Sequence, residues 1–418
     1  MSLRVAQISA GAAGMYCGSC MHANTVARTL IDQGHEVALI PTYTPLRTDE
    51  ARVVTGERVF FSAINVYLQE KIPFFRHAPR WVDRLFESRP LLRMLSKMDA
   101  AGTDGRDIAS LTLSVLQGAD GHQAKELDKL VEWLETDYRP DVVQLAFAFF
   151  LGFAGPIKQR LGVPILCLLQ GEDLTLDDMP ADGRAAVVAA MREKARDVDR
   201  FLAPNAYYAD AMADLLDVPR ARFGIAPLGV DPADFFVDDP DGAHGAADGA
   251  SSTEQRGAED RRAADPARAD GALQIGFLGR RCPEKGLHLL TAAFERLAAD
   301  HPTLRLRIAG YLSKRDHAYN NDLLAQLDRA GLSERVDVVG EVDRAGKVDF
   351  LHSLDLFALP TVYREPKGLS VIEAMACGVP VVQPDHGSFP EMLADDGGGV
   401  LVAPDDAGAL AAGVDALL

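Results

Sequence analysis

Short apolar runs alternate with segments of helical periodicity along this chain, and this alternation constrains the fold more than any other feature. Arg4–Ser9 is an apolar-rich run that leads into a glycine-rich turn, and the following apolar residues fall at helical spacing until Gly34. Val37–Ile40 is apolar again, so the amino terminus predicts a strand, a turn, a helix and a second strand, the opening of a βαβ unit. Further strands are predicted at residues 140–145, 164–169, 201–204 and 224–227, with a helix near residues 155–161.

A stretch without large apolar side chains interrupts this alternation. Residues 238–270 are mainly Ala, Asp, Gly and Arg, and such a segment cannot bury enough surface to offset the entropy of ordering. Apolar runs resume at 273–278, 304–310, 335–340, 354–360 and 379–384. We therefore predict an α/β protein of two doubly wound parallel-sheet domains that face each other across a cleft: an amino-terminal domain over residues 1–235, a disordered linker over 236–271 and a carboxyl-terminal domain over 272–418.

The composition argues against several classes of protein. A formal net charge of -18 disfavours nucleic acid as a partner, because phosphate binding relies on Lys and Arg. The first residues lack a signal-peptide pattern and no apolar run is long enough to span a bilayer, so we expect a cytoplasmic protein. Cys17 and Cys20 form one C-x-x-C pair, but a zinc site needs two more ligands. We expect no metal, with a redox pair as a minority alternative.

Two glutamates follow the apolar run 354–360, in the segment EPKGLSVIE. A proline and a glycine between them oppose helix, so Glu365 is expected on the loop after a strand. The next helix is expected to begin near Gly368 or Leu369, with Glu373 about one turn inside it. Amides at a helix start suit a diphosphate, and the carboxylates could accept hydrogen bonds from sugar and ribose hydroxyls. Alternatively, both glutamates are solvated surface charges.

Three further motifs follow predicted strands. In GRRCPEKG, Arg280 and Lys285 could neutralise the two phosphates of a leaving group, or the motif could be an ordinary helix start. In QGED, Glu172 or Asp173 could orient an acceptor hydroxyl or take its proton, or could cap the next helix. The first turn contains Gly18 among its glycines, which by itself is a weak sign of nucleotide binding.

In this order, the motifs resemble the family 4 glycosyltransferases of the GT-B fold. The two glutamates, GRRCPEKG, PLGVD, VVGEVDR and HGSFPE match in type, order and position, from residue 5 to about residue 404 without the linker. GHEV and the CGSC turn resemble a bacterial branch of that family. The resemblance implies a retaining transfer from a nucleotide-diphosphate sugar, without a metal or bound cofactor, in which the departing phosphate deprotonates the acceptor.

The resemblance also assigns roles to individual residues. It implies that Arg280 and Lys285 hold the diphosphate, that Glu365 contacts the donor hexose and that Glu373 contacts the ribose. The remaining donor positions that it implies are the amides of Gly368 and Leu369 for a phosphate, Gly18 for close approach, and Gly340 and Val342 beside the base.

Three departures from the family pattern stand out. The usual Gly-Gly of the first turn is Cys17-Gly18, and the usual histidine loop is QGED. The sequence also ends at Leu418 within a predicted helix, where the family usually continues with helices that cross back onto the first domain, so either it is cut short there or this member closes differently. A sugar-nucleotide epimerase or hydrolase and a non-catalytic binding protein remain alternatives. A nicotinamide oxidoreductase is weaker, because the glycine turn is not a G-x-G-x-x-G.

One basic and aromatic segment, Lys71–Lys97, lies outside these motifs. It could contact a membrane surface peripherally and present a lipid-linked acceptor. The alternative is a lid or helix pair packed on its own domain. The acceptor, a sugar or a lipid-linked molecule, is not specified by the sequence.

Overall fold

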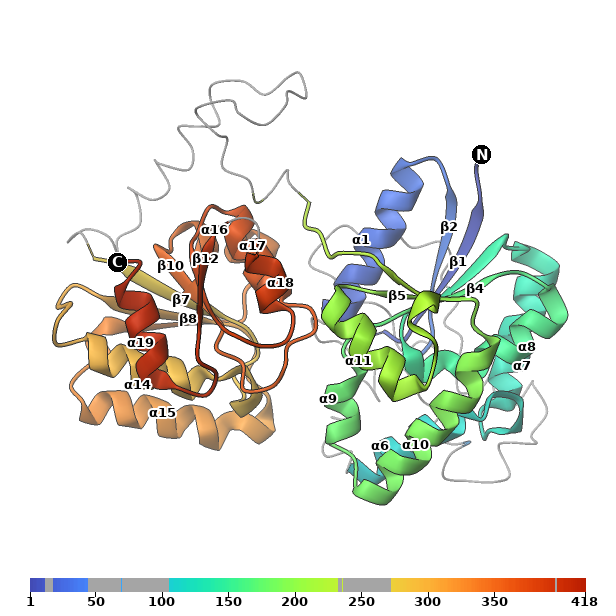
Figure 1. Cartoon of the computed structure of the whole chain (residues 1–418), viewed down its shortest axis with the longest axis horizontal. Coiled ribbons are helices and arrows are strands. Elements are labelled where there is room, and N and C mark those ends of the chain that lie inside the picture. Colours follow the sequence, from blue (N-terminus) through green and yellow to red (C-terminus); the bar gives the residue numbers. More distant parts are fainter. Residues whose placement is uncertain (12–17, 44–68, 70–104, 232–234, 236–271, 395–396) are drawn as a thin grey trace, which may run out of the picture. The chain divides into compact units, whose positions relative to one another are not determined.

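The computed structural model describes residues 1–11, 18–43, 69, 105–231, 235, 272–394 and 397–418 (Figure 1). The predicted linker, 236–271, and the basic segment Lys71–Lys97 lie outside the described residues. The chain divides into two compact units, Met1–Pro227 (unit 1) and Leu228–Leu418 (unit 2). Each unit is built on one parallel sheet, as the alternation of strands and helices predicts.

The sheet of unit 1 has the strand order β2-β1-β3-β4-β5-β6, and every pairing in it is parallel. Its strands, each overlapping a run predicted as strand, are β1 (Arg4–Ser9), β2 (Glu36–Pro41), β3 (Val142–Leu145), β4 (Ile165–Leu168), β5 (Arg200–Ala203) and β6 (Phe223–Ile225). The described helices are α1 (Gly18–Asp32), α6 (Gly105–Leu116), α7 (Ala124–Trp133), α8 (Leu151–Leu161), α9 (Glu172–Asp177), α10 (Ala181–Lys194) and α11 (Ala206–Leu216).

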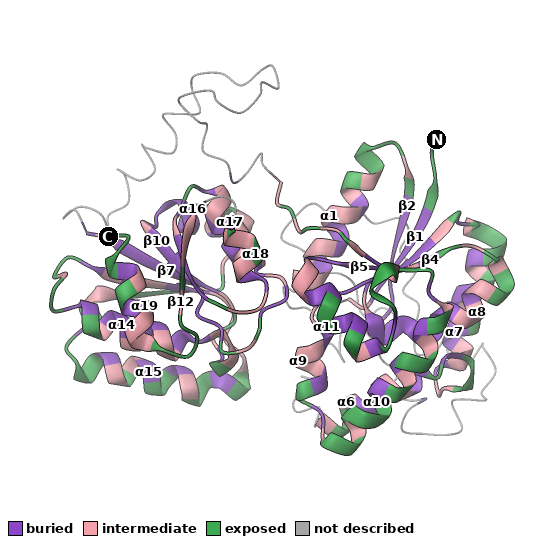
Figure 2. Cartoon of the chain, in the orientation of Figure 1, coloured by how far each residue is buried: buried purple, intermediate pink, exposed green. Residues whose placement is uncertain are grey.

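The two faces of this sheet belong to two separate hydrophobic cores. Successive side chains of a strand point to opposite faces, and Val5 of β1 packs with Ala23 and Ala27 of α1. Its neighbours in the same strand, Ala6 and Ile8, belong instead to the larger core. Burial on both faces explains why the central strands are apolar runs whose residues are mostly buried (Figure 2).

The sheet of unit 2 has the order β12-β11-β10-β7-β8-β9, again entirely parallel. Its strands are β7 (Gln274–Leu278), β8 (Arg305–Ala309), β9 (Val336–Gly340), β10 (Leu356–Ala358), β11 (Val381–Pro384) and β12 (Gly399–Val402). β12 was not predicted from the sequence, because this edge strand is only partly buried and follows a run of glycines. The described helices are α14 (Leu287–Leu297), α15 (His317–Arg329), α16 (Arg344–His352), α17 (Leu369–Ala376), α18 (Phe389–Leu393) and α19 (Ala407–Asp415).

The strand order of unit 2 identifies where a ligand can bind. From β7 the chain proceeds through β8 to β9 on one side, and it then returns to β10 on the other side of β7. In open parallel sheets, ligands bind beyond the carboxyl ends of the strands at such a change of direction. The loops that follow β7 and β10 are those that carry the predicted cations and the first glutamate.

Candidate functional site

The loops after β7 and β10 are joined through their backbones. The first passes through the turn Pro283–Lys285 into Gly286, whose φ is +72°. A Cβ atom on Gly286 would lie 1.7 Å from the carbonyl oxygen of Pro360, so only glycine allows this close approach. The amide of Val362 also donates a hydrogen bond to the carbonyl of Glu284 at 3.0 Å. The two loops are therefore held against each other before any side chain contributes.

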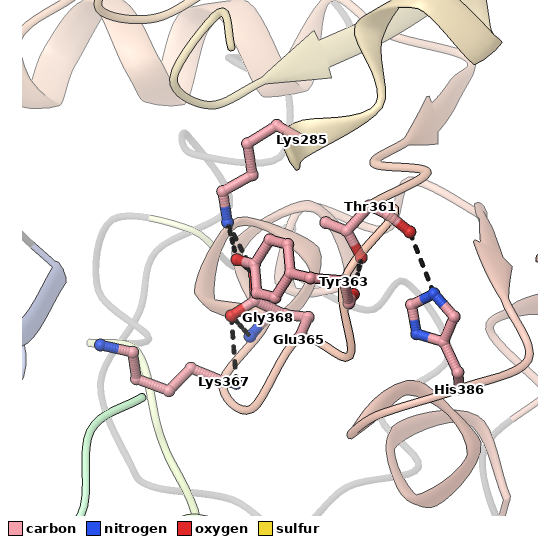
Figure 3. A network of polar contacts seen from close by, with 7 residues as sticks. All are labelled: Lys285, Thr361, Tyr363, Glu365, Lys367, Gly368 and His386. Atoms are coloured by element: carbon pink, nitrogen blue, oxygen red, sulfur yellow. Dashed lines mark hydrogen bonds and ion pairs between the residues drawn. The ribbon is translucent and has the colours of Figure 1, made fainter. Parts of the chain in front are cut away.

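This backbone contact brings Lys285 to Glu365 (Figure 3). The Nζ atom of Lys285 lies 2.6 Å from Oε2 of Glu365 and 2.6 Å from the hydroxyl oxygen of Tyr363. The Tyr363 hydroxyl donates to the same Oε2. The other oxygen, Oε1, accepts hydrogen bonds from the amides of Lys367 at 3.2 Å and Gly368 at 3.3 Å. A buried carboxylate is thus surrounded by one cation, one phenol and two amides.

The surroundings keep Glu365 ionised. Burial raises the pKa of this carboxyl, but the charge of Lys285 and the hydrogen bonds from Lys285 and Tyr363 outweigh it and lower the pKa to about 2. Burial and the neighbouring Glu365 raise the pKa of Tyr363 well above its ordinary value, so the phenol stays neutral and donates. The arrangement is a permanent anion with fixed donors, suited to accept hydrogen bonds from a polar ligand.

Arg280 adds a second positive group to this edge of the sheet. It follows Gly279 at the end of β7, and its side chain is exposed. Desolvation lowers the pKa of Arg280, whereas Cys282, Tyr363 and other acidic neighbours raise it by more, so the guanidinium remains charged. The structure therefore brings Lys285 to Glu365, and it places Arg280 within electrostatic range of Tyr363 in the same cluster.

α17 begins where the sequence predicts. Gly368 is its N-cap residue with φ +61°, Leu369 is its first residue, and Glu373 lies one turn inside. The amide of Gly368 is occupied by Glu365, whereas the amide of Leu369 is in the first turn, where helical geometry provides no backbone acceptor. Leu369 is thus better placed than Gly368 to donate to an anion.

Glu373 is buried, and it pairs with a lysine that the sequence analysis did not single out. Its Oε1 atom lies 2.6 Å from Nζ of Lys347 on α16. Gly340, with φ +87°, is the last residue of β9, and the partly buried Val342 lies in the turn that leads from it into α16. The predicted base-side residues therefore lie on the segment that leads to this lysine.

In unit 1, Gly18 is the first residue of α1, and Glu172 opens the short helix α9. The carboxylate of Glu172 is buried and accepts hydrogen bonds from the amides of Ala148 at 2.9 Å, Gln170 at 3.0 Å and Gly171 at 3.1 Å. It also accepts from the hydroxyl of Tyr208 at 2.8 Å. Glu172 thus fixes the backbone of its own unit, which leaves Asp173 as the more accessible acceptor-side candidate.

Asp173 is a different kind of carboxyl from Glu365. The Tyr208 hydroxyl lies 3.1 Å from its Oδ1 atom and 2.8 Å from Glu172, and one phenolic proton cannot serve both at once. Burial raises the pKa of Asp173, the Tyr208 hydrogen bond lowers it, and the charge of Glu172 raises it further, to about 6. This carboxyl can change its protonation state near neutral pH.

Comparison with known protein families identifies the family to which the chain belongs. Residues 18–229, about half of the chain, match the family described as glycosyl transferase 4-like domain. Residues 259–418 match the family described as glycosyl transferases group 1. The chain belongs to the glycosyltransferases of this family.

Relatives with assigned names resemble part of this glycosyltransferase. A D-inositol 3-phosphate glycosyltransferase of Mycobacterium sp. (strain KMS) is 37% identical over 144 residues, which is 34% of this chain and 32% of the relative. A glycogen synthase of Mycobacterium tuberculosis is 34% identical over 148 residues, 35% of this chain and 34% of the relative. The chain thus matches only about a third of the length of these relatives.

Solved structures share the fold of the glycosyltransferase at low identity. HepE from Anabaena, in complex with UDP and glucose, has a TM-score of 0.63 and 16% identity, over 99% of this chain and 89% of its own. Sucrose-phosphate synthase from Thermosynechococcus elongatus has a TM-score of 0.65 and 18% identity, over 99% and 89%. The two-domain GT-B fold predicted from the sequence is confirmed.

Sequence reasoning missed three residues of the glycosyltransferase: Tyr208, Lys347 and Tyr363. Tyr363 stands two residues before Glu365, so its place in the same loop was a usable signal. Lys347 occupies a buried position of a helix whose neighbouring positions are Val348 and Leu351, and a lysine on an apolar face is a second usable signal. No local pattern indicates that Tyr208, from α11, meets the QGED loop.

Other predictions for the glycosyltransferase are only partly covered by the structure. Cys17 lies outside the described residues, and Cys20 is buried in α1. Within the described ranges, no cluster of three or more His, Cys, Asp or Glu side chains is arranged to hold a metal ion. The helices in those ranges are also too short or too polar to cross a bilayer.

Proposed function

We propose that this glycosyltransferase moves a sugar from a nucleotide-diphosphate sugar to an acceptor hydroxyl with retention of configuration. The observation that carries the proposal is the contact between Lys285 and Glu365 at the point where the strand order of unit 2 changes direction. A buried anion beside the cation of Lys285, with the charged Arg280 on the same loop, matches a donor whose sugar offers hydroxyl donors and whose diphosphate is negative.

Lys285 links the two halves of such a donor. An ammonium group has three N–H donors, and within the described residues its contacts use two of them, to Glu365 and Tyr363. The third is directed to an oxygen of the diphosphate, which Arg280 also contacts. As the bond between the sugar C1 atom and the phosphate oxygen breaks, these charges stabilise the departing diphosphate.

The other donor contacts follow from the positions described above. Glu365 accepts hydrogen bonds from the hexose, Glu373 accepts from the ribose, and the amide of Leu369, with Gly368 beside it, faces a phosphate. Gly340 and Val342 border the base, and Gly18 allows close approach in unit 1. Neither a metal nor a bound cofactor is required, because the cations of the chain supply the positive charge.

On the acceptor side, Asp173 orients the attacking hydroxyl, with Glu172 holding its loop. The new bond forms between the acceptor oxygen and C1 on the face from which the diphosphate leaves, and the departing phosphate takes the acceptor proton. The acceptor is a sugar or a lipid-linked molecule, and Lys71–Lys97 is proposed to contact a membrane peripherally at the cytoplasmic face.

Measurements of donor binding and of the reaction product test the proposal. UDP-glucose is the first donor to try, since HepE was crystallised with UDP and glucose, followed by other UDP, GDP and ADP sugars. We expect a raised melting temperature with the correct donor, and a glycosylated product with the donor's anomeric configuration, undiminished by EDTA. Conversion of the donor without any acceptor would indicate an epimerase or hydrolase, and binding without turnover a non-catalytic protein. Absence of binding across all donors would refute the proposal.

A further inference from the structure

Lys347 is a buried cation for which the donor chemistry described above has no role. It lies on α16 with only 7% of its surface exposed, and its partner Glu373 on α17 is 5% exposed. Their Nζ and Oε1 atoms are 2.6 Å apart. An ion pair this deep is costly to form from solvated groups, so it is weak evidence for a stabilising role. Its geometric effect on Glu373 is the more informative property.

An aromatic ring holds the ammonium from another direction. Phe235 is 1% exposed and packs in the core of unit 2, although it comes from the segment that follows Pro227–Asp231. The Lys347 Nζ atom lies 5.5 Å from the centre of its ring, within the range of a cation–π interaction. Arg344, one turn earlier on α16, lies over the same ring at 5.1 Å. Lys347 is thus fixed between a ring and a carboxylate.

These contacts of Lys347 determine the orientation of the Glu373 side chain. A glutamate on a helix has several rotamers, and a ligand that needs one of them loses affinity by the fraction of time spent in the others. A charged hydrogen bond from a fixed lysine to Oε1 selects one rotamer of the glutamate. A carboxylate held in this way is preorganised to accept hydrogen bonds from a vicinal diol.

We propose that Lys347, seated on Phe235, is a positioning residue that fixes Glu373 for recognition of the nucleotide's ribose hydroxyls. This inference rests on the proposed function, because it takes Glu373 as the ribose ligand. It adds that discrimination between a ribose and a sugar without these hydroxyls depends on a residue that does not touch the nucleotide. Lys347 then acts on affinity for the ribose alone and leaves the phosphate contacts unchanged.

The test compares binding of two nucleotides by calorimetry. Among UDP, GDP and ADP, the one that binds is paired with its 2′,3′-dideoxy form. The wild type is expected to prefer the ribonucleotide by roughly tenfold or more, as for hydrogen bonds to a charged group. Lys347→Met should reduce this preference to within about threefold of unity, leave the dideoxy affinity unchanged, and be partly rescued by Lys347→Arg. Arg344→Met is the matched control, because it removes the other cation from Phe235 and should retain the full preference.

A second pair of variants controls for the possibility that Lys347→Met does not fold. Lys347→Met removes the cation that pairs with Glu373, so the same change is also made on the Glu373→Ala background, where neither member of the pair is present. If Lys347 acts only through Glu373, the double variant binds the ribonucleotide as Glu373→Ala does. An unchanged ribose preference in Lys347→Met, or an equal loss for the dideoxy form, overturns the inference while the proposed function stands. If the wild type binds none of the three nucleotides, both fall together.

Discussion

Two carboxyl groups of this protein have similar surroundings, but their pKa values are shifted in opposite directions. Glu365 in unit 2 and Asp173 in unit 1 both follow a parallel strand, and each accepts a hydrogen bond from a tyrosine hydroxyl. Glu365 also has Lys285 at 2.6 Å, whereas Asp173 has a second carboxylate, Glu172, across the shared phenol. The pKa is lowered to about 2 in the first case and raised to about 6 in the second. Burial raises the pKa of both carboxyls. Lys285 outweighs it at Glu365, whereas at Asp173 burial prevails and the charge of Glu172 adds to it, so only Asp173 titrates near neutral pH.

Among the substitutions that test this comparison, replacement of Lys285 should have the largest effect. Lys285→Met leaves Glu365 buried with its phenol and amide donors but without the cation that contacts it, and it removes a charge from the leaving diphosphate. We expect kcat with saturating donor to fall by about a hundredfold or more, and the free energy of unfolding to fall by about 3–5 kcal/mol.

The matched control for Lys285→Met is Lys158→Met, which breaks an ion pair of similar length with Asp199. Both of these side chains are 40% exposed, against 16% and 6% for Lys285 and Glu365. This variant should lose about 1 kcal/mol or less and keep its activity. Equal losses of stability in the two variants would show that burial does not distinguish the pairs.

A change at Asp173 should alter the pH dependence of the reaction. Below pH 6, protonation removes the charge that orients the acceptor, so kcat/KM of the wild type should fall on the acid side of pH 6. Asp173→Asn should lower kcat/KM at pH 8 by about tenfold and flatten the acid limb. If the acid limb of the kcat/KM profile persists in Asp173→Asn, it arises from the titration of a group other than Asp173.

The same variant should change the pH dependence of stability. A carboxyl whose pKa rises on folding, from 3.8 to about 6, favours the folded state at low pH, and that contribution is lost as the pH rises through 6. Asp173→Asn keeps an oxygen acceptor for Tyr208 and no longer ionises. We expect it to be more stable than the wild type by about 1–2 kcal/mol at pH 8, with a smaller difference at pH 5.5, in urea unfolding. A difference that does not vary with pH would contradict the raised pKa.

The smallest effect should come from Tyr208→Phe. The hydroxyl of Tyr208 lowers the pKa of Asp173, so its removal should move the acid limb of kcat/KM to higher pH without abolishing it. A shift to lower pH would reverse the assigned role of the phenol. Tyr363→Phe is the counterpart in unit 2, and it should leave the pH profile above pH 5 unchanged, because Glu365 keeps Lys285.

Much of this architecture could be predicted from residue order, because the relevant signals are local. The start of α17 at Leu369 and the loop position of Glu365 follow from one glycine and one proline. The partners of the two glutamates could not be predicted in this way, since Lys347 and Glu373 are brought together by packing of two helices. The meeting of Tyr208 with Asp173 likewise depends on the tertiary fold, and β12 lacks the burial that makes a strand visible in sequence.

Gly286 sets a limit for anyone who wishes to redesign the specificity of this enzyme family member. Its contact with Pro360 aligns two loops through main-chain atoms, and no side chain can be added there without forcing the backbones apart. A library that is to accommodate a different sugar should therefore keep position 286 constant, together with Lys285, Tyr363 and Glu365. Even alanine at this position should misalign the cation from the carboxylate, and no compensating substitution of either charged residue would restore the spacing.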